Sequence, residues 1–379
     1  MMHQRTGLIL LAAMWFIAGT AQTQTKDGIR GESDWKTAAR EKVGRWMHDH
    51  RIPGAAIAAS VNGRTIWSEG FGFADLEQHV PVHPERTRFR IASISKPLTS
   101  TGLARLIEQG KIHPDSSIAH YLPWFPKKKY RPTVRQVAGH TGGIRHYRGM
   151  ENFSQTRYPD VRSGVKIFED DSLLYKPGTA YVYSSYGYNL LSAVMESASG
   201  KPYLRFMDEE VLRPLGMSWT TADRLDSIIP FRGRYYERDG RPSPPVDNSY
   251  KWAGGGYLST AADLIRFGNG YLQTSLLKDV TIGELTVSQK LMNGQETGYG
   301  MGWATGRDKA GRPTYGHSGG AVGGTSQLLI HPQAGVVLVI LTNASGAPIS
   351  QLSDDLFNSI LSGIEPADRR GRSNRVKSK

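Results

Sequence analysis

The chain has 379 residues, 39% hydrophobic and 21% charged, which is typical of a soluble globular protein with one large domain or two lobes. Its formal net charge is +13, but the sequence contains no basic helix, zinc module or basic-aromatic platform, so we expect no nucleic-acid partner. Cysteine is absent, which excludes disulfides, thiol catalysis and cysteine metal sites.

The first segment is typical of a secretory signal. Arg5 gives a weakly positive start, and the apolar run 8–18 is too short to cross a bilayer comfortably. Gly19-Thr20-Ala21 supplies small residues for cleavage. We therefore expect a signal peptide over residues 1–21, a secreted or periplasmic protein, and no stable membrane insertion after cleavage. The alternatives are an uncleaved anchor or an organelle signal, although a mitochondrial transit peptide would be amphipathic and richer in Arg and Ser.

A helix and a hairpin follow. Residues 34–51 have a helical pattern that ends at Pro53-Gly54. Two strand-like runs, 55–61 and 64–68, flank Asn62-Gly63, which is a strong hairpin signal.

The next segment, Ser93-Ile94-Ser95-Lys96, places a serine one helical turn before a lysine. Residues i and i+3 share a helix face, so Lys96 can reach Ser93 and act as a base for its hydroxyl. Apolar residues over 98–109, followed by Gly110, predict a buried helix with a glycine cap. Pro97 is tolerated only in the first turn of this helix, so residues 93–96 lie at the N-terminal end of the helix. The free N–H groups at this end favour an oxyanion.

Beyond the tetrad, residues 95–230 combine helical patterns with proline-marked loops. One loop, bounded by Pro126 and Pro132, carries Lys127-Lys128-Lys129 and could attract an anionic surface weakly. Near the C-terminus, the runs 327–330 and 336–342 flank a turn at 332–335 and predict a second hairpin, followed by an amphipathic helix over 348–361.

Hairpins imply an antiparallel sheet. We expect an α/β (α+β) fold in which one sheet joins both ends of the chain, packed by the terminal helices, with a helical lobe inserted between them. The domain should span residues 34–362, and the basic residues of 365–379 are typical of a disordered tail.

Two further segments accompany the tetrad. One is 176–191, which contains Tyr183-Ser184-Ser185, and the other is Gly316-His317-Ser318-Gly319-Gly320. With Ser93 and Lys96, their order and spacing resemble the three motifs of the serine β-lactamase and penicillin-binding-protein superfamily: S-x-x-K, then Y-x-N, then K-T-G or H-x-G. The resemblance covers about residues 34–362.

The amino-acid sequences of three flanking segments narrow this resemblance to the class C β-lactamase-related branch, of the peptidase S12 type. Within the branch, these segments are most similar to the mitochondrial serine β-lactamase-like proteases; they are residues 90–96, 140–147 and 253–260.

The resemblance implies a β-lactamase/transpeptidase-like fold, no cofactor, and catalysis by Ser93, Lys96 and Tyr183. Ser93 would become acylated, while Lys96 and Tyr183 would share the general-base work. Because free Lys and Tyr titrate near ~10, one of them must be lowered to act at neutral pH. The N–H groups of Ser93 and Gly320 would form the oxyanion hole, and Ser185, His317, Ser318 and Gly319 would complete the substrate-binding side.

Two positions depart from the family pattern. Ser185 replaces the usual Asn that contacts the substrate amide, which predicts weak or no β-lactamase activity. His317 replaces a lysine, and an unshifted histidine is charged only below about pH 6.5. We therefore expect less dependence on a substrate carboxylate, and a pH profile that differs between carboxylate substrates and neutral esters.

The third motif and the histidines also allow other interpretations. Residues 316–320 also match the G-x-S-x-G nucleophile elbow, which would make Ser318 the nucleophile, but glycines follow where the elbow needs a helix.

Among the histidines, His48, His50, His79 and His83 show no metal-site pattern, so no metal is expected. His140 is interpreted as a structural loop residue, His146 as a residue of the site's rim, and Gly254-Gly255-Gly256 as a tight turn near the site.

The sequence thus predicts a serine hydrolase acting through a Ser93 acyl-enzyme on an ester or an amide or peptide bond, with a small molecule or peptide as substrate. The alternative is a non-catalytic penicillin-recognising or assembly-forming protein that binds without turnover. Nothing in the sequence indicates the oligomeric state.

Overall fold

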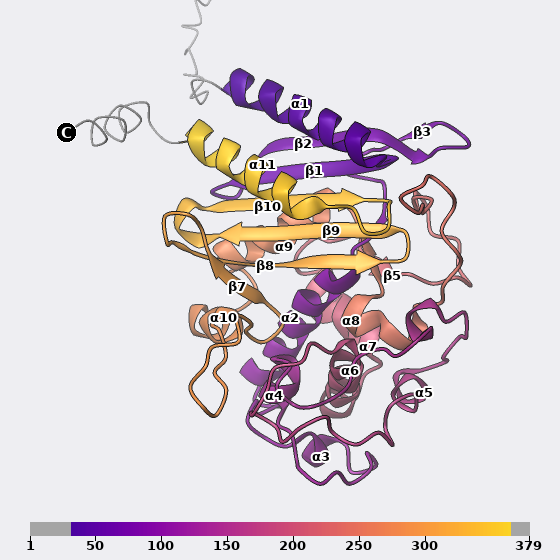
Figure 1. Cartoon of the computed structure of the whole chain (residues 1–379). Helices are drawn as coiled ribbons and strands as arrows, with labels where there is room; N and C mark the ends of the chain where they lie inside the picture. The colour runs from indigo at the N-terminus through magenta and orange to yellow at the C-terminus, as the bar shows by residue number, and fades with distance from the viewer. Residues whose placement is uncertain (1–31, 365–379) are drawn as a thin grey trace, which may run out of the picture.

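The computed structural model describes residues 32–364 (Figure 1). The expected signal peptide over 1–21 and the basic tail over 365–379 lie outside the described residues.

In the described part of the chain, the strands of the main sheet lie toward the two ends, and most of the helices lie between them. The longer helices are α1 Glu32–His50, α2 Ser95–Glu108, α6 Ser185–Ser199, α9 Ala261–Leu272, α10 Asp279–Thr286 and α11 Ile349–Ile364. The shorter ones are α3 Ile118–Tyr121, α4 Val134–Ala138, α5 Val161–Val165, α7 Tyr203–Met207 and α8 Trp252–Gly255, with 3₁₀ turns η1 Ala92–Ile94 and η4 Ser249–Lys251. The strands are β1 Gly54–Val61, β2 Arg64–Asp75, β3 Val80–Pro81, β4 Phe89–Arg90, β5 Thr221–Ala222, β6 Tyr257–Ser259, β7 Ala304–Arg307, β8 Pro313–Ala321, β9 Gly324–His331 and β10 Val336–Thr342.

A seven-stranded sheet joins the two ends of the described chain, in the order β3-β2-β1-β10-β9-β8-β7. All its strand pairs are antiparallel, and β1 lies directly against β10. Both predicted hairpins are confirmed: β1 and β2 turn at Asn62-Gly63, and β9 and β10 turn at 332–335. The predicted fold class is therefore correct.

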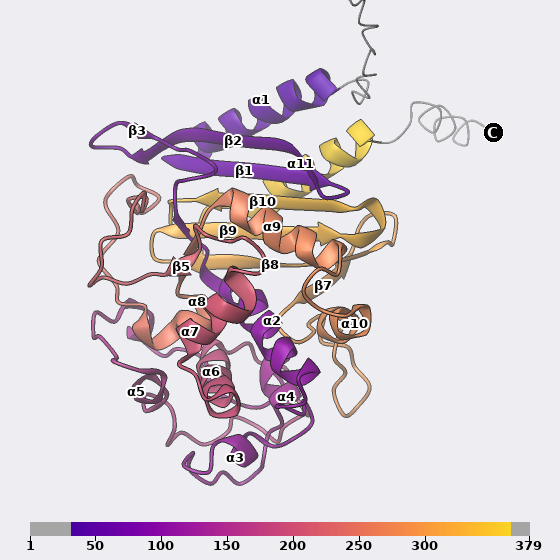
Figure 2. The ribbon, with the colours of Figure 1, turned by 180° about the vertical axis from the view of Figure 1, so that it is seen from behind.

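The alternation of side chains along the central strands gives the sheet two buried faces. Ala55, Ile57 and Ala59 of β1 pack with the terminal helices α1 and α11, in a cluster that includes Trp46 and Leu356. The alternate β1 residues face the larger core on the other side, where α9 contacts β1 and β10. Figure 2 shows α9 across this second face. The predicted packing of the sheet by the terminal helices is confirmed.

The helical lobe lies beyond the β8 and β7 side of the sheet, and α2 runs from the sheet into it (Figures 1 and 2). Residues 95–104 of α2 are buried on all sides because the helix packs against α6 and α8 as well as the sheet side of the core. Gly110 has a φ of +70° just after the helix, as the predicted glycine cap requires. Within residues 32–364 no helix combines the length and apolar character that a membrane crossing needs.

Candidate active site

Ser93 lies in the 3₁₀ turn η1, immediately before α2. Ala92 precedes it with a φ of +47°, a left-handed conformation that is uncommon for a residue with a side chain and that concentrates at functional sites. The Ser95 hydroxyl stabilises this turn by donating to the Ala92 carbonyl at 2.7 Å. The turn holds the partly exposed Ser93 immediately before α2, whose residues 95–104 are all buried.

Lys96 is completely buried, and its ammonium nitrogen has three oxygen neighbours. The Nζ atom lies 3.2 Å from Ser93 Oγ, 3.1 Å from Ser185 Oγ and 2.5 Å from the Gly254 carbonyl oxygen. The expected contact between serine and lysine is therefore present, and Ser185 joins it from the first residue of α6.

Burial lowers the pKa of Lys96 well below its usual value, and the positive charge of Lys251 lowers it further. Lys251 is itself buried, and the burial lowers its pKa to about 7. Its ammonium group donates to the carbonyl oxygen and the Oδ1 atom of Asn152, at 3.0 and 2.8 Å. Burial therefore shifts Lys96 toward the neutral amine, which is the state that can accept a proton.

Tyr183 lies beside this pair, with its ring centroid 4.7 Å from Lys96 Nζ. Burial raises the pKa of Tyr183, although a hydrogen bond with the Ser93 side chain opposes the shift. Of the two candidate bases, Lys96 is thus the one whose pKa is lowered, and Tyr183 is held as a neutral phenol. The His140 ring packs on Tyr183 at 4.3 Å between centroids.

Strand β8 brings the third motif against the turn that carries Ser93. A Cβ atom added at Gly319 would lie 2.5 Å from the Ile91 carbonyl oxygen and 2.9 Å from the Ala92 Cβ, so this close approach requires glycine. A Cβ atom at Gly320 would meet nothing within 4 Å. Gly320 is exposed beside the serine, where the expected oxyanion hole needs open space.

His317 is a buried residue of β8, and both of its ring nitrogens form hydrogen bonds. Its Nδ1 atom lies 2.5 Å from the Ser318 carbonyl oxygen, and its Nε2 atom lies 2.8 Å from the Tyr299 hydroxyl. Since a carbonyl only accepts, Nδ1 carries the proton and Nε2 accepts from Tyr299. Burial, with the Lys96 charge, lowers the pKa of His317 to about 3.

This environment argues against the expectation that His317 titrates within the working range and supplies a pH-dependent charge for a substrate carboxylate. The imidazole is neutral above about pH 3. Its role in the folded protein is to tie β8 to Tyr299 on the segment before β7.

Two histidines from the loop after α4 hold the second motif in place. The His140 Nδ1 atom accepts from the Ser184 N–H, and the His146 Nδ1 atom accepts from the Ser185 N–H, both at 3.1 Å. Burial, with the charges of Lys96 and Lys251, lowers the pKa of His146 to about 4. His140 is thus a structural loop residue, as expected, with a φ of +61°. His146 is half-buried at the edge of the site.

The nucleophile-elbow alternative does not fit the structure. Ser318 lies within strand β8, and the chain continues through a turn into β9 instead of entering a helix. His331, the only downstream histidine, is engaged with Asp308 at 3.1 Å. Within the described residues no cluster of three or more His, Asp or Glu side chains could hold a metal ion.

Sequence reasoning missed two parts of the site. Lys251 was not singled out, because a single lysine three residues before a glycine run carries no signal of burial. Gly254 was expected only in a nearby turn, yet its carbonyl accepts from Lys96. A Cβ atom there would lie 2.8 Å from the Ser185 carbonyl oxygen, so the glycine allows α8 to approach α6.

Comparisons with known proteins agree with this geometry. The family model described as Beta-lactamase matches residues 39–357. The serine beta-lactamase-like protein LACTB, mitochondrial, of Mus musculus is 31% identical, over 83% of this chain and 76% of that protein. The octameric penicillin-binding protein homologue from Pyrococcus abyssi has a TM-score of 0.74 at 25% identity, over 86% of this chain and 77% of its own. The D-amino acid amidase from Ochrobactrum anthropi shares the fold, with a TM-score of 0.74 at 22% identity over 88% and 100% of the two chains.

Proposed function

The chain belongs to the beta-lactamase family, and we propose that within this family it is a serine hydrolase that acts through a Ser93 acyl-enzyme on ester, amide or peptide bonds. The observation that carries the proposal is the contact of 3.2 Å between Ser93 Oγ and the amine of a buried lysine, Lys96. A serine hydroxyl becomes a useful nucleophile only when a neighbouring base takes its proton.

The hydrogen bonds around Lys96 account for every proton of a neutral amine. Such an amine has two N–H bonds and one lone pair. The Gly254 carbonyl and the Ser185 hydroxyl can accept the two N–H bonds, at 2.5 and 3.1 Å. The lone pair is then left for the Ser93 proton. Ser93 Oγ forms its bond to the substrate carbonyl carbon as the proton passes to Lys96 Nζ.

Tyr183 is suited to the opposite task. Because burial keeps its phenol protonated, it can donate to the leaving group as the acyl-enzyme forms and be reprotonated from Lys96. The N–H groups of Ser93 and Gly320 would stabilise the oxyanion; a single donor of this kind typically contributes ~3 kcal/mol to lowering the barrier.

The substrate class follows from what the site offers to a ligand. His317 is neutral and internally hydrogen bonded, so it supplies no charge for a substrate carboxylate. Ser185 replaces a longer amide side chain and already bonds Lys96. Both features favour neutral esters and amides over efficient turnover of β-lactams, which carry a carboxylate.

The direct test is hydrolysis of a chromogenic ester such as p-nitrophenyl acetate. We expect the wild-type protein to turn over the ester and the Ser93→Ala variant to lose this activity, while Ser318→Ala, which lacks a substrate-binding side chain but not the nucleophile, retains measurable turnover. Ester hydrolysis that survives in Ser93→Ala would contradict the proposed mechanism. Ligand-induced stabilisation without turnover would support a non-catalytic binding protein instead.

Export from the cytoplasm is a further proposal, which rests on the apolar run 8–18 and the small residues at 19–21. The mouse relative is named as mitochondrial, so the two destinations need to be distinguished. N-terminal sequencing of the mature protein from a fractionated native host should find cleavage near Ala21 and an extracytoplasmic fraction; an intact N-terminus would contradict the proposal.

A further inference from the structure

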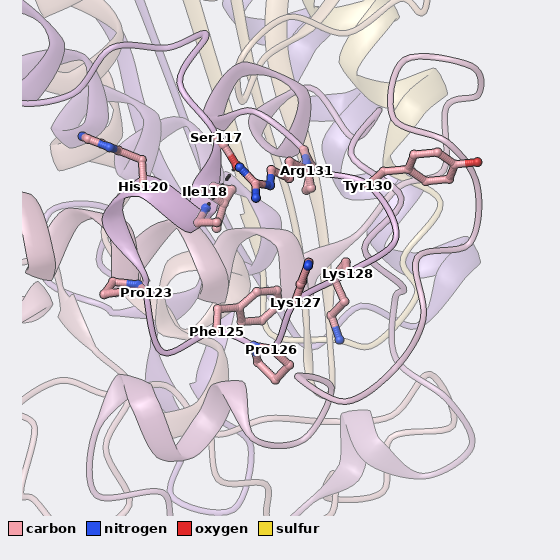
Figure 3. A pocket seen from close by; sticks show the side chains of 12 residues that line it. Ser117, Ile118, His120, Pro123, Phe125, Pro126, Lys127, Lys128, Tyr130 and Arg131 are labelled. Carbon is pink, nitrogen blue, oxygen red and sulfur yellow. Dashed lines mark hydrogen bonds between the residues drawn. The ribbon is translucent and has the colours of Figure 1, made fainter.

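A second pocket lies beside α3, at the end of the helical lobe away from the seven-stranded sheet (Figures 1 and 3). Its volume is about 370 Å³, and it is partly open to solvent and lined by Ser117, α3 and the loop 123–132. None of the catalytic candidates lines it, so it is separate from the site around Ser93.

The pocket is basic and contains no carboxylate. Its lining includes Lys127, Lys128 and Arg131, together with His120, but no Asp or Glu. Figure 3 shows Lys127, Lys128 and Arg131 on the loop that lines the pocket, together with Phe125 and Pro126.

Two of these cations are available to a ligand. Lys128 bonds the Glu169 carbonyl, lies 5.2 Å from the Phe125 ring centroid, and faces the charges of Asp170 and Asp171. By contrast, the Lys127 and Arg131 side chains have no hydrogen bond or ion pair with any residue of the described range 32–364. Many other arginines in this range are paired, as Arg135 is with Asp115 at 2.7 Å.

The rest of the lining combines the polar residues Ser117 and Tyr130 with an apolar part. Ile118 and Phe125 are buried, and prolines at 123, 126 and 132 restrict the loop. The Ile118 N–H donates to the Pro132 carbonyl at 3.0 Å, which ties the end of the loop to the first residue of α3. A site that is already in place loses little conformational entropy when it binds.

We propose that this pocket binds a small amphiphilic carboxylate, with the anionic group between Lys127 and Arg131 and an apolar body against Phe125. The volume is near the lower end of the ~300–1,000 Å³ range of ligand pockets, which favours a small molecule over a peptide chain. Charge alone would suit any anion, but the buried aromatic and aliphatic surface selects one that carries a short hydrocarbon portion. The proposal does not depend on the activity of Ser93.

Isothermal titration calorimetry on the full chain tests the proposal, with octanoate as the probe. Acetate lacks the apolar body, octylamine has the opposite charge, and inorganic phosphate carries charge without hydrocarbon. We expect saturable binding of one octanoate per chain, at least about tenfold tighter than any of these three. Such a difference is within the range of one charge-assisted hydrogen bond or a few buried methylenes.

The Lys127→Gln/Arg131→Gln double variant should bind octanoate at least about tenfold more weakly. Its matched control is Arg64→Gln/Lys309→Gln, which removes two exposed and equally unpaired cations elsewhere and should bind as the wild type does. Neither double variant removes a side-chain hydrogen bond or ion pair within residues 32–364, and equal melting temperatures would verify that the fold is unaffected.

Three outcomes would overturn the proposal. They are unchanged octanoate affinity in the Lys127→Gln/Arg131→Gln variant, phosphate binding as tight as octanoate binding, and loss of octanoate binding when Ser93 is blocked by a fluorophosphonate. The last outcome would place the ligand in the active site. Failure of Ser93 to react with the fluorophosphonate would contradict the proposed function but leave the comparison of the double variants intact.

Discussion

Replacing Gly319 by alanine should damage the oxyanion hole without preventing folding. The added Cβ atom would lie 2.3 Å from Ser326 Oγ and 2.5 Å from the Ile91 carbonyl oxygen. These separations are about 1 Å shorter than the ~3.5 Å at which non-bonded atoms pack best, so β8 must move away from the turn that carries Ser93. A displacement of ~1 Å at a reacting centre can cost about 10²-fold in rate, and loss of one oxyanion donor costs a similar 10²–10³-fold.

The matched control is Gly268→Ala. Its Cβ atom would lie 2.5 Å from a methyl carbon of Val337, between α9 and β10, away from Ser93. Overpacking of this kind typically costs ~1–3 kcal/mol of stability, and we expect both variants to lose stability within that range. Only Gly319→Ala should also lose about 10²-fold in kcat.

The assay combines kcat for p-nitrophenyl acetate, the rate of Ser93 labelling by a fluorophosphonate, and urea unfolding of each variant. Retention of wild-type kcat within a few-fold in Gly319→Ala would refute the argument that β8 sets the oxyanion hole. An equal loss of kcat in Gly268→Ala would show that general destabilisation, and not the position of β8, controls the rate.

Three further predictions concern charge in the site. Lys96→Met should lower kcat by about 10³-fold, within the range of general-base catalysis, yet unfold at higher urea concentration than the wild type at pH 7. In the unfolded chain this lysine keeps its proton up to its ordinary pKa near 10.5, whereas in the folded chain its pKa is lower. The stability of the wild type therefore rises with pH between these two pKa values, and the stabilities of the two proteins should converge near pH 10.5. A wild type that is more stable than Lys96→Met at pH 7 would count against a neutral buried amine. Lys251→Met should move the acidic limb of the pH profile of kcat/KM to higher pH, since removal of a nearby cation lets Lys96 keep its proton; an unmoved limb would show that Lys251 does not tune Lys96. Because the pKa of His317 is about 3, the pH profiles of activity on carboxylate substrates and on neutral esters should have the same shape between pH 5 and 8. A divergence of the two profiles centred near pH 6.5 would show that His317 titrates.

Much of the fold could be predicted from the sequence because its signals are local. Asn62-Gly63 specifies a hairpin through its backbone preferences, and the glycine after α2 marks a helix end in the same way. The contact between Ser93 and Lys96 is also local, since residues three apart on a helical segment are neighbours.

The parts that escaped prediction depend on long-range packing. Lys251 tunes a lysine 155 positions earlier in the chain only because α8 packs against α2 and α6. The neutral state of His317 depends on Tyr299 and on burial, neither of which leaves a pattern in the motif itself. The sequence specified which residue types are present, whereas the pKa values follow from the neighbours that the fold supplies.

The central claim is that Lys96 activates Ser93 as a nucleophile. The most direct measurement is to treat the purified protein with a fluorophosphonate probe and to map the labelled peptide by mass spectrometry. The account predicts label on Ser93 in the wild-type protein and none in Lys96→Ala. Label on Ser318, or no label on the folded wild-type protein, would contradict it.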